Sequence, residues 1–281
     1  MSENNNGQGS ANDGRHHMDS LLMRESLVDK DLIAATEKEP PTVRMLPHCQ
    51  VIKIGGRSIF DRGRKALLPV ADVLGEALEK QKLIIGTGGG ARTRHVYSIG
   101  VDLGLPTGVL AQVSIADALG TAHILGTLLA PHGVVAIPPE IFGHLLPFFM
   151  RGAPGVIFNG DPPYALWEHP PALGRIPPHR TDVGSYLLAE CFGAERLILV
   201  KDVDGLYTAD PNQDSSAEFI PEISVDEIKE RGITTLPFEE VLLDLLPKGR
   251  LMREFRIING LKPELITQAL NGEPVGTRVY A

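Results

Sequence analysis

The sequence is poor in cysteine, in aromatic residues and in long apolar runs. Two cysteines, Cys49 and Cys191, occur among 281 residues, so the chain has neither a disulfide framework nor the cysteine spacing of a zinc site. Both are predicted to be small core residues. No apolar stretch typical of a secretory signal precedes Met18, and no later run is predicted to be long enough to span a bilayer. We therefore expect a soluble, cytoplasmic protein with no membrane partner.

Clusters of basic residues are also missing. The chain has 27 Lys and Arg against 35 Asp and Glu, which gives a formal net charge of −8. This balance argues against a nucleic-acid partner, and a polyanionic substrate would need a local positive site. The length suits either one large α/β domain or two lobes, and it leaves both open.

The first 45 residues differ in composition from the rest. Up to about residue 18 they are polar and glycine-rich, which predicts a disordered tail. Apolar residues then recur at helical spacing between Asp19 and Thr36, and Pro40 and Pro41 follow. This pattern predicts a helical arm that packs on its own domain or reaches a neighbouring subunit. Residues 46–281 are predicted to form the main α/β domain.

Short apolar strands alternate with helices in this main domain. Strands are predicted at 51–54, 82–86, 134–137, 156–158, 197–200, 255–258 and 277–280, and helices at 62–80, 91–103, 115–130, 139–150, 183–192, 225–230 and 238–246. Unalternating apolar strands are typical of a parallel sheet that is buried on both faces, so an α/β fold with a mostly parallel sheet is predicted. No GxGxxG motif follows the first strand, which argues against a dinucleotide-binding Rossmann domain.

Glycines follow two of the predicted strands. The first strand contains Lys53 and ends in Gly55 and Gly56. A buried lysine needs an anionic partner, and glycine lets the backbone approach a ligand closely, so this strand end suits a phosphate. In the alternative, Lys53 extends outward from an ordinary turn. The second strand ends in the turn 87–90 before a new helix, an arrangement that also favours an anion.

Two later segments carry further polar residues of the same kind. Lys201 follows the strand 197–200, and Asp204, Gly205, Tyr207 and Asp210 come close behind. Such residues can hold a phosphate and clasp a ribose and base, although Asp-Gly and Asp-Pro are also common in ordinary turns. Further upstream, Thr181 is predicted to cap the helix 183–192. Asp182 would complement the helix dipole, or lie beside bound Mg²⁺ or phosphate.

A proline-rich segment separates these motifs. Residues 161–180 contain so many prolines that helix and central strand are excluded. The segment also holds the only tryptophan of the chain, two histidines and two arginines. It is predicted to be a lid or a subunit contact, or else a rigid surface loop.

The motifs at residues 53–56, 86–90, 181–182 and 201–211, taken in order and spacing, resemble the amino-acid-kinase superfamily and especially bacterial uridylate kinases, over residues 48–281. Residues 102–106, 162–164 and 176–182 and the arm are similar to the molybdenum storage protein branch. This resemblance implies a three-layer αβα sandwich that binds ATP with Mg²⁺. It also implies a hexameric cage, a trimer of dimers, homomeric or with an alpha-type subunit. In that cage ATP hydrolysis drives molybdate or tungstate inside to condense as polyoxometalate clusters.

The resemblance also implies roles for individual residues. Lys53 would contact the transferring phosphate, Lys201 would add a second charge, and Asp182 would lie near the acceptor phosphate or metal. The nucleotide-binding residues would be Gly55, Gly56, Arg57, Gly88, Gly89, Gly90, Asp204, Gly205, Tyr207 and Asp210. Arg94, Asp117 and Arg180 are substrate-binding candidates, and the first two match positions that meet UMP in uridylate kinases. Such chemistry needs positioning and charge neutralisation more than a base.

This sequence departs from the pattern of the storage proteins, so the residues that would bind the polyoxometalate clusters cannot be assigned by resemblance. The alpha-type storage subunit has histidines after Pro-Pro-Tyr, whereas Ala165, Leu166 and Trp167 stand here, as in the beta-type subunit. Metal-ligand candidates by chemistry alone are His123, His144, His169 and His179, and each can equally be an ordinary structural histidine. Two alternative functions remain: a uridylate kinase, and a catalytically silent nucleotide-binding structural subunit.

Overall fold

The computed structural model of the chain describes residues 42–164, 173–211 and 213–281. The compact unit described below comprises Val43–Ala281. Residues 1–41, with nearly all of the predicted tail and arm, and residues 165–172 of the predicted lid, with Trp167 and His169, lie outside the described residues.

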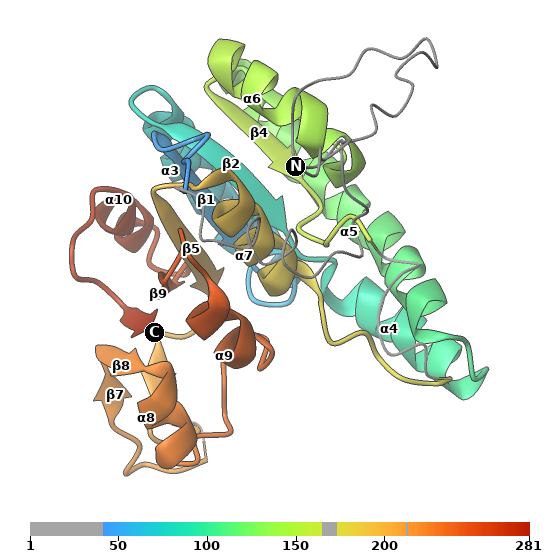
Figure 1. The fold of residues 1–281 in the computed structure, drawn as a ribbon, viewed down its shortest axis with the longest axis vertical. Coiled ribbons are helices and arrows are strands. Elements are labelled where there is room, and N and C mark those ends of the chain that lie inside the picture. Colours follow the sequence, from blue (N-terminus) through green and yellow to red (C-terminus); the bar gives the residue numbers. More distant parts are fainter. Residues whose placement is uncertain (1–41, 165–172, 212) are drawn as a thin grey trace, which may run out of the picture. The chain divides into compact units, whose positions relative to one another are not determined.

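A mainly parallel sheet forms the centre of this unit (Figure 1). Its strand order, among the described residues, is β3 (Val134–Ala136), β4 (Gly155–Phe158), β2 (Lys82–Thr87), β1 (Cys49–Ile54), β5 (Arg196–Lys201), β9 (Glu254–Asn259), β10 (Thr277–Tyr280) and β8 (Glu222–Ser224). Neighbouring strands are parallel except β9 and β10, which are antiparallel. A separate antiparallel pair joins β6 (Leu206–Tyr207) to β7 (Phe219–Ile220).

Helices cover both faces of the sheet. Val51 and Ile52 of β1 are both fully buried and belong to different core clusters, because successive side chains point to opposite faces. The cluster of Ile52 includes residues of α3 (Arg64–Leu78), α5 (Thr107–Leu129) and α10 (Glu264–Leu270). The cluster of Val51 includes residues of α6 (Phe142–Gly152), α7 (Thr181–Phe192), α8 (Val225–Glu230) and α9 (Leu242–Leu245). The predicted three-layer αβα fold is therefore confirmed.

The remaining elements are short, apart from α4 (Gly90–Asp102), which packs against α5. They are the 3-10 helices η1 (Phe60–Arg62), η2 (Ala130–His132), η3 (Pro139–Ile141) and η5 (Leu246–Lys248). The predicted strands and most predicted helices are present with small shifts at their ends. The strands β6, β7 and β8 and the helix α10 were not predicted, because they are too short to show a clear period.

Two predicted helices have different bounds. The helix predicted to begin at residue 115 begins at Thr107, directly after Pro106, and its first turns bury Leu110 against the fold. The helix predicted for residues 238–246 is reduced to Leu242–Leu245 and the following 3-10 turn. Glu239, the second residue of the predicted helix, instead turns its side chain toward α7.

The helical run Thr107–His132 is long and apolar enough, by length and composition, to cross a membrane, so the expectation that no run is long enough is wrong. A window of 18 residues within this run has a mean hydropathy of 1.4. Leu125 and Leu129 are fully buried in the same core cluster as β1 and β2. A core helix passes the same test, so this helix alone is weak evidence for a membrane span.

The two cysteines lie in different environments. Cys49 is buried in β1, and burial raises the pKa of its thiol to about 11. Cys191 is exposed, so the prediction that it is a core residue is wrong. It falls outside the buried face of α7, which is formed by residues such as Val183, Tyr186 and Ala189. Both thiols are free.

Candidate functional site

A pocket of about 980 Å³ opens at the carboxyl ends of β1, β2, β4 and β5. This is the edge at which parallel α/β sheets place their ligands. Of the predicted site residues, the pocket is lined by Lys53, Gly55, Gly56, Arg57, Gly88, Gly89, Gly90, Arg94, Arg180, Asp182, Lys201, Gly205, Tyr207 and Asp210. Segments that are far apart in the sequence therefore meet around one cavity.

The register of the sheet brings the two lysines together. Ile54 of β1 pairs with Val200 of β5, so Lys53 and Lys201 lie near the ends of adjacent parallel strands. Val51 and Leu199 point to the face of the sheet that α7 covers. Lys53 comes two residues after Val51, and Lys201 comes two residues after Leu199, so both lysines point to the same face. The two ammonium groups consequently point toward the same helix.

Asp182, in the first turn of α7, pairs with both lysines. Lys201 Nζ lies 2.7 Å from Asp182 Oδ2 and donates a hydrogen bond to it, and Lys53 Nζ lies 2.8 Å from Oδ1 as an ion pair. The side chains of Lys53 and Asp182 are 5% and 4% exposed. One carboxylate thus holds two buried cations, and the site keeps a net positive charge for an anionic ligand.

These contacts shift the pKa values of the buried groups. Burial would raise the pKa of Asp182, but the charges of Lys201 and Lys53 outweigh it and hold that pKa well below its usual range. Burial lowers the pKa of the Lys201 ammonium, and Asp182 offsets part of this shift. Asp182 is therefore ionised throughout the neutral range.

Two glycine turns contact each other beneath the lysines. A Cβ atom on Gly56 would lie 2.3 Å from the amide nitrogen of Gly90 and 2.5 Å from the carbonyl oxygen of Gly88. The amides of Gly55 and Gly88 donate to the carbonyls of Val200 and Ile54, respectively, which extends the strand pairing past the strand ends. Only glycine fits this contact, so the turns present backbone rather than side chains to a ligand.

Gly56→Ala is expected to destabilise the chain by about 1–3 kcal/mol and to weaken the binding of an anion in the pocket, because the new methyl group meets backbone atoms that cannot move aside. Chemical denaturation and anion titration measure the two effects. Gly143→Ala is the matched control: no atom lies within 4 Å of its Cβ position in α6, so it should be neutral or slightly stabilising. Equal behaviour of the two variants would contradict the close contact.

At the N-terminus of α4, one backbone amide is hydrogen-bonded to a side chain of the protein. Asp61, which follows the first glycine turn, accepts a hydrogen bond of 2.7 Å from the amide of Ala91 through Oδ2. The sequence motif alone suggested a helix N-terminus open to phosphate. In the structure, the amide of Ala91 is hydrogen-bonded to Asp61, so the glycine turn that precedes it is the part that can meet a ligand.

The N-terminus of α7 is capped from a distant loop. Glu239 accepts hydrogen bonds from the amides of Arg180, Asp182 and Val183, at 3.0, 3.0 and 3.1 Å. Thr181 is the first residue of the helix and makes no capping hydrogen bond, so the prediction that it is the N-cap is wrong. Glu239 lines the pocket but was missed, because no local pattern links it to a helix that begins 58 residues earlier.

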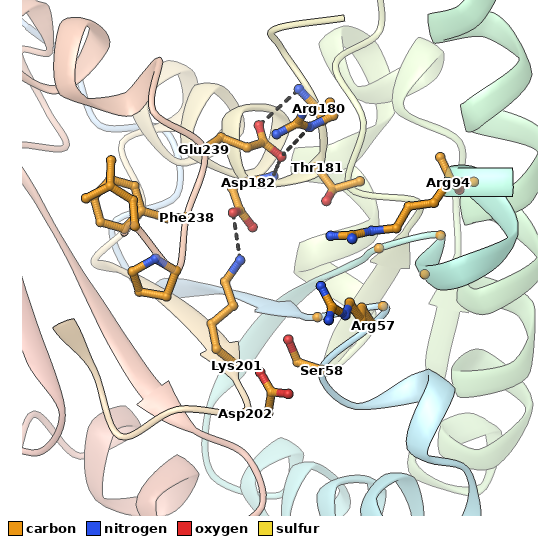
Figure 2. A pocket seen from close by; sticks show the side chains of 18 of the residues that line it. Arg57, Ser58, Arg94, Arg180, Thr181, Asp182, Lys201, Asp202, Phe238 and Glu239 are labelled. Atoms are coloured by element: carbon orange, nitrogen blue, oxygen red, sulfur yellow. Dashed lines mark hydrogen bonds and ion pairs between the residues drawn. The ribbon is translucent and has the colours of Figure 1, made fainter. Parts of the chain in front are cut away.

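Three arginines add positive charge to the pocket. Figure 2 shows the Arg57 and Arg94 side chains extending into the space in front of Thr181, with Arg180 beside Glu239. Arg180 Nε lies 3.7 Å from Glu239 Oε1, and the Arg180 side chain is partly exposed. Guanidinium groups suit the oxygens of phosphate or another tetrahedral oxoanion.

Gly205, Tyr207 and Asp210 line the side of the pocket next to Lys201. The Tyr207 ring packs edge-on against Phe219, with 5.6 Å between the ring centroids. Asp204 does not line the pocket. It accepts hydrogen bonds from Lys262 and Asn259, which lower the pKa of its carboxyl. Asp204 therefore lies where it can fix the shape of the loop that carries Gly205 and Tyr207.

Several predicted residues lie away from the pocket. Asp117 and His123 are on α5 and do not line it, and His123 is exposed. His179 contacts the ring of Tyr164. The part of the chain that the structure describes contains no group of three or more His, Cys, Asp or Glu side chains that could hold a metal ion. His144 belongs to α6, and His169 lies outside the described residues.

Asp161 is a second pocket residue that sequence reasoning missed. It is 5% exposed and lines the pocket beside Ser114, whereas in the sequence it is only the start of the proline-rich segment. Burial, and then the charge of Glu239, raise the pKa of its carboxyl to about 8, although Lys53, Ser114 and Arg180 act in the opposite direction. At neutral pH this carboxyl group is therefore largely protonated.

The model of the amino acid kinase family matches residues 48–243, a span that contains both lysines, both glycine turns and Asp182. The chain belongs to the amino acid kinase family. Among solved structures of this fold, uridylate kinase from Archaeoglobus fulgidus superposes with a TM-score of 0.64 at 23% identity, over 82% of this chain and 99% of that one. UMP kinase from Bacillus anthracis also gives a TM-score of 0.64, at 18% identity, over 84% and 96%. These structures support the fold.

A much closer relative is the molybdenum storage protein subunit beta of Azotobacter vinelandii. The two sequences are 48% identical over 267 residues, which cover 94% of this chain and 97% of the relative. Uridylate kinase of Hyperthermus butylicus is 28% identical over 82% of this chain and 96% of the enzyme. The predicted resemblance to a beta-type storage subunit is thereby confirmed.

Proposed function

We propose that this chain is an ATP-binding subunit of a molybdate or tungstate store, which couples ATP hydrolysis to oxoanion uptake and deposition as polyoxometalate clusters in an oligomeric cage. The observation that carries the proposal is the 48% identity to a molybdenum storage subunit over nearly the full length, combined with the cationic pocket. The cage is proposed as a cytoplasmic hexamer, a trimer of dimers, homomeric or with an alpha-type partner.

The pocket suits the triphosphate of ATP. Lys53 and Lys201 provide two buried cations that share one carboxylate, and the turns at Gly56 and Gly88 bring backbone close to a ligand. In phosphoryl transfer, catalysis comes from positioning and charge neutralisation, which these groups supply without a nucleophile. Tyr207, Gly205 and Asp210 lie on the side where the nucleoside would extend.

Mg²⁺ would bind together with the nucleotide. Protein sites for Mg²⁺ commonly use few side chains, because phosphate oxygens and water complete the octahedron. That mode agrees with the lack of a metal-ligand cluster among the described residues. Bound Mg²⁺ would neutralise developing charge on the phosphates. The residues of this chain would hold the phosphates in place and orient them.

The other half of the pocket suits an oxoanion. The pocket is also lined by Arg94 of α4, Ser114 of α5, Asp161 after β4 and Arg180 before α7. Their charged and polar groups match the oxygens of a molybdate or tungstate ion, which would be cargo rather than a resident cofactor. Of the described histidine side chains, His123 and His179 do not line this pocket, so the cluster ligands remain a separate prediction.

The main alternative is a uridylate kinase that converts ATP and UMP to ADP and UDP. Arg94 lines the pocket as that function requires, but Asp117, the expected ribose contact, does not. A third alternative is a nucleotide-binding structural subunit without turnover. Both alternatives share the triphosphate site with the storage function. They differ from it in the ligand that occupies the other half of the pocket.

Metal retention separates these functions. The purified chain, alone and mixed with an alpha-type subunit, is incubated with ATP, Mg²⁺ and molybdate, desalted, and analysed for molybdenum and ADP. Storage predicts far more than a few molybdenum atoms per chain, and only when ATP is present; a sample without ATP is the control. No retained molybdenum, together with UDP formation from UMP, would overturn the proposal. If neither retained molybdenum nor UDP is detected, the result would favour the structural subunit.

A further inference from the structure

Asp161 has a buried carboxyl oxygen that the proposed ATP site does not use. The residue is 5% exposed at the pocket wall, shortly after β4, and Oδ2 has no hydrogen-bond partner among the described residues. The other oxygen, Oδ1, lies 3.5 Å from Ser114 Oγ, which itself donates to the carbonyl of Ala111. An unpaired buried polar atom is costly, and Asp161 lines the cavity, so a ligand that binds beside this residue can supply the missing partner.

The groups that face Asp161 come from every element packed around it. They are Lys53 of β1, Tyr97 of α4, Ser114 of α5, Arg180 directly before α7, and Glu239 before α9. Burial, followed by the nearby carboxylate of Glu239, keeps the proton on Asp161, whose pKa is raised to about 8. Burial also raises the pKa of Tyr97, so its hydroxyl remains a donor over the same pH range.

A protonated carboxyl group donates one hydrogen bond, whereas a carboxylate only accepts. Molybdate and tungstate carry no proton at neutral pH, and each of their oxygens is an acceptor. Inorganic phosphate keeps a hydroxyl group at neutral pH and can match a carboxylate as well. The state of one buried carboxyl therefore decides which anion fits, because a mismatched polar pair leaves a buried group unsatisfied.

We propose that Asp161 acts as a proton-bearing specificity residue: its Oδ2–H donates to an oxygen of the bound oxoanion and favours anions that carry no proton of their own. This proposal rests on the proposed oxoanion store. It makes anion binding depend on pH, since loss of the Asp161 proton replaces a donor by a negative charge next to the ligand.

The test measures molybdate and inorganic phosphate binding by calorimetry between pH 6.5 and 9.5, with a non-hydrolysable ATP analogue and Mg²⁺ present. In the unaltered chain, molybdate affinity should fall about tenfold per pH unit above about pH 8. Asp161→Asn keeps an N–H donor and cannot ionise, so it should bind within a few-fold at pH 7 and lose most of that pH dependence. Asp161→Leu should lose at least about tenfold at pH 7.

Two controls isolate Asp161. Asp72→Asn changes an exposed aspartate on α3 and should keep both the affinity and the pH profile. Lys201, whose pKa is lowered by burial, also loses charge at high pH, and the slope that remains in Asp161→Asn measures its share. Without any ligand, the unaltered chain should lose stability relative to Asp161→Asn as the pH rises from about 4 to 8, because the folded state holds a proton that the unfolded state releases.

The outcomes separate this proposal from the proposed function. Molybdate binding that depends equally on pH in the unaltered chain and in Asp161→Asn would overturn the role of Asp161 and leave the store intact. No molybdate binding by the unaltered chain at any pH would overturn both. Parallel stability profiles of the two ligand-free proteins would show that Asp161 is not protonated, and would overturn its role as a donor.

Discussion

Replacing Lys53 with methionine is expected to lower ATP-dependent activity by about 10³-fold or more while the chain stays folded. Methionine keeps most of the volume of the buried stem and removes the charge that would lie on the transferring phosphate, the kind of loss typical of charge-neutralising groups in phosphoryl transfer. ATP hydrolysis or molybdenum retention measures the effect, with circular dichroism to check the fold.

The structure also predicts how this variant changes stability. Asp182 loses one of two ion pairs and keeps Lys201, so the cost should be at or below the lower end of the range for a broken buried pair, about 3 kcal/mol. Because the pKa of Asp182 lies below its usual range, its contribution is present above about pH 4 and is lost as the pH falls through the folded value. Acid unfolding of Lys53→Met should therefore show a weaker pH dependence.

A matched control for this variant is Lys229→Ala. Lys229 forms an exposed ion pair with Asp244, and such surface pairs contribute about 0–1 kcal/mol. It should change neither activity nor acid unfolding. Activity within a few-fold of the unaltered chain in Lys53→Met would mean that Lys53 is structural and that the phosphate site is wrongly assigned.

Replacing Glu239 with alanine is expected to destabilise the chain by about 3–5 kcal/mol and to lower activity by about 10²-fold. The change leaves the amides of Arg180, Asp182 and Val183 without their acceptor at a buried helix terminus. The first turn of α7 holds Asp182 against both lysines, so a small displacement there would move the charges that position the phosphates. Chemical denaturation and steady-state kinetics measure the two effects.

Glu240→Ala and Glu239→Gln serve as the comparison. Glu240 is exposed beside Glu239, so its removal should have little effect. The glutamine variant keeps one acceptor oxygen and should recover part of the stability. Its recovery should grow with rising pH, because burial and the charge of Asp182 raise the pKa of Glu239 and make its ionised form costly. Full activity in Glu239→Ala would show that α7 needs no cap from this loop.

Much of the site could be predicted from local sequence alone. A lysine is rarely placed in a buried apolar strand without an anionic partner, and the two glycines that follow Lys53 leave room for one. The glycine turn after β2 indicates an anion site in the same way. Side chains alternate along a strand, so the face of each lysine was fixed by its distance from Val51 or Leu199. These features are local and need no knowledge of which strands are neighbours.

Glu239 and Asp161 could not be predicted in the same way. Glu239 lies in a short irregular segment between α8 and α9, and its partner is the start of a helix 58 residues away in the sequence. Asp161 is one residue of a proline-rich segment, where an aspartate is ordinary turn chemistry. Only burial distinguishes it, and burial depends on how α4, α5 and α7 pack around it.

The sequence by itself determined the layers of the fold, the strand ends and the two lysines, because hydrophobic period and glycine placement are properties of neighbouring residues. The tertiary structure decided how those strand ends are ordered in the sheet, and so why Lys53 meets Lys201 across Asp182. It also decided which carboxyl groups keep their protons, since the pKa of a buried acid depends on charges that the chain brings together only when it folds.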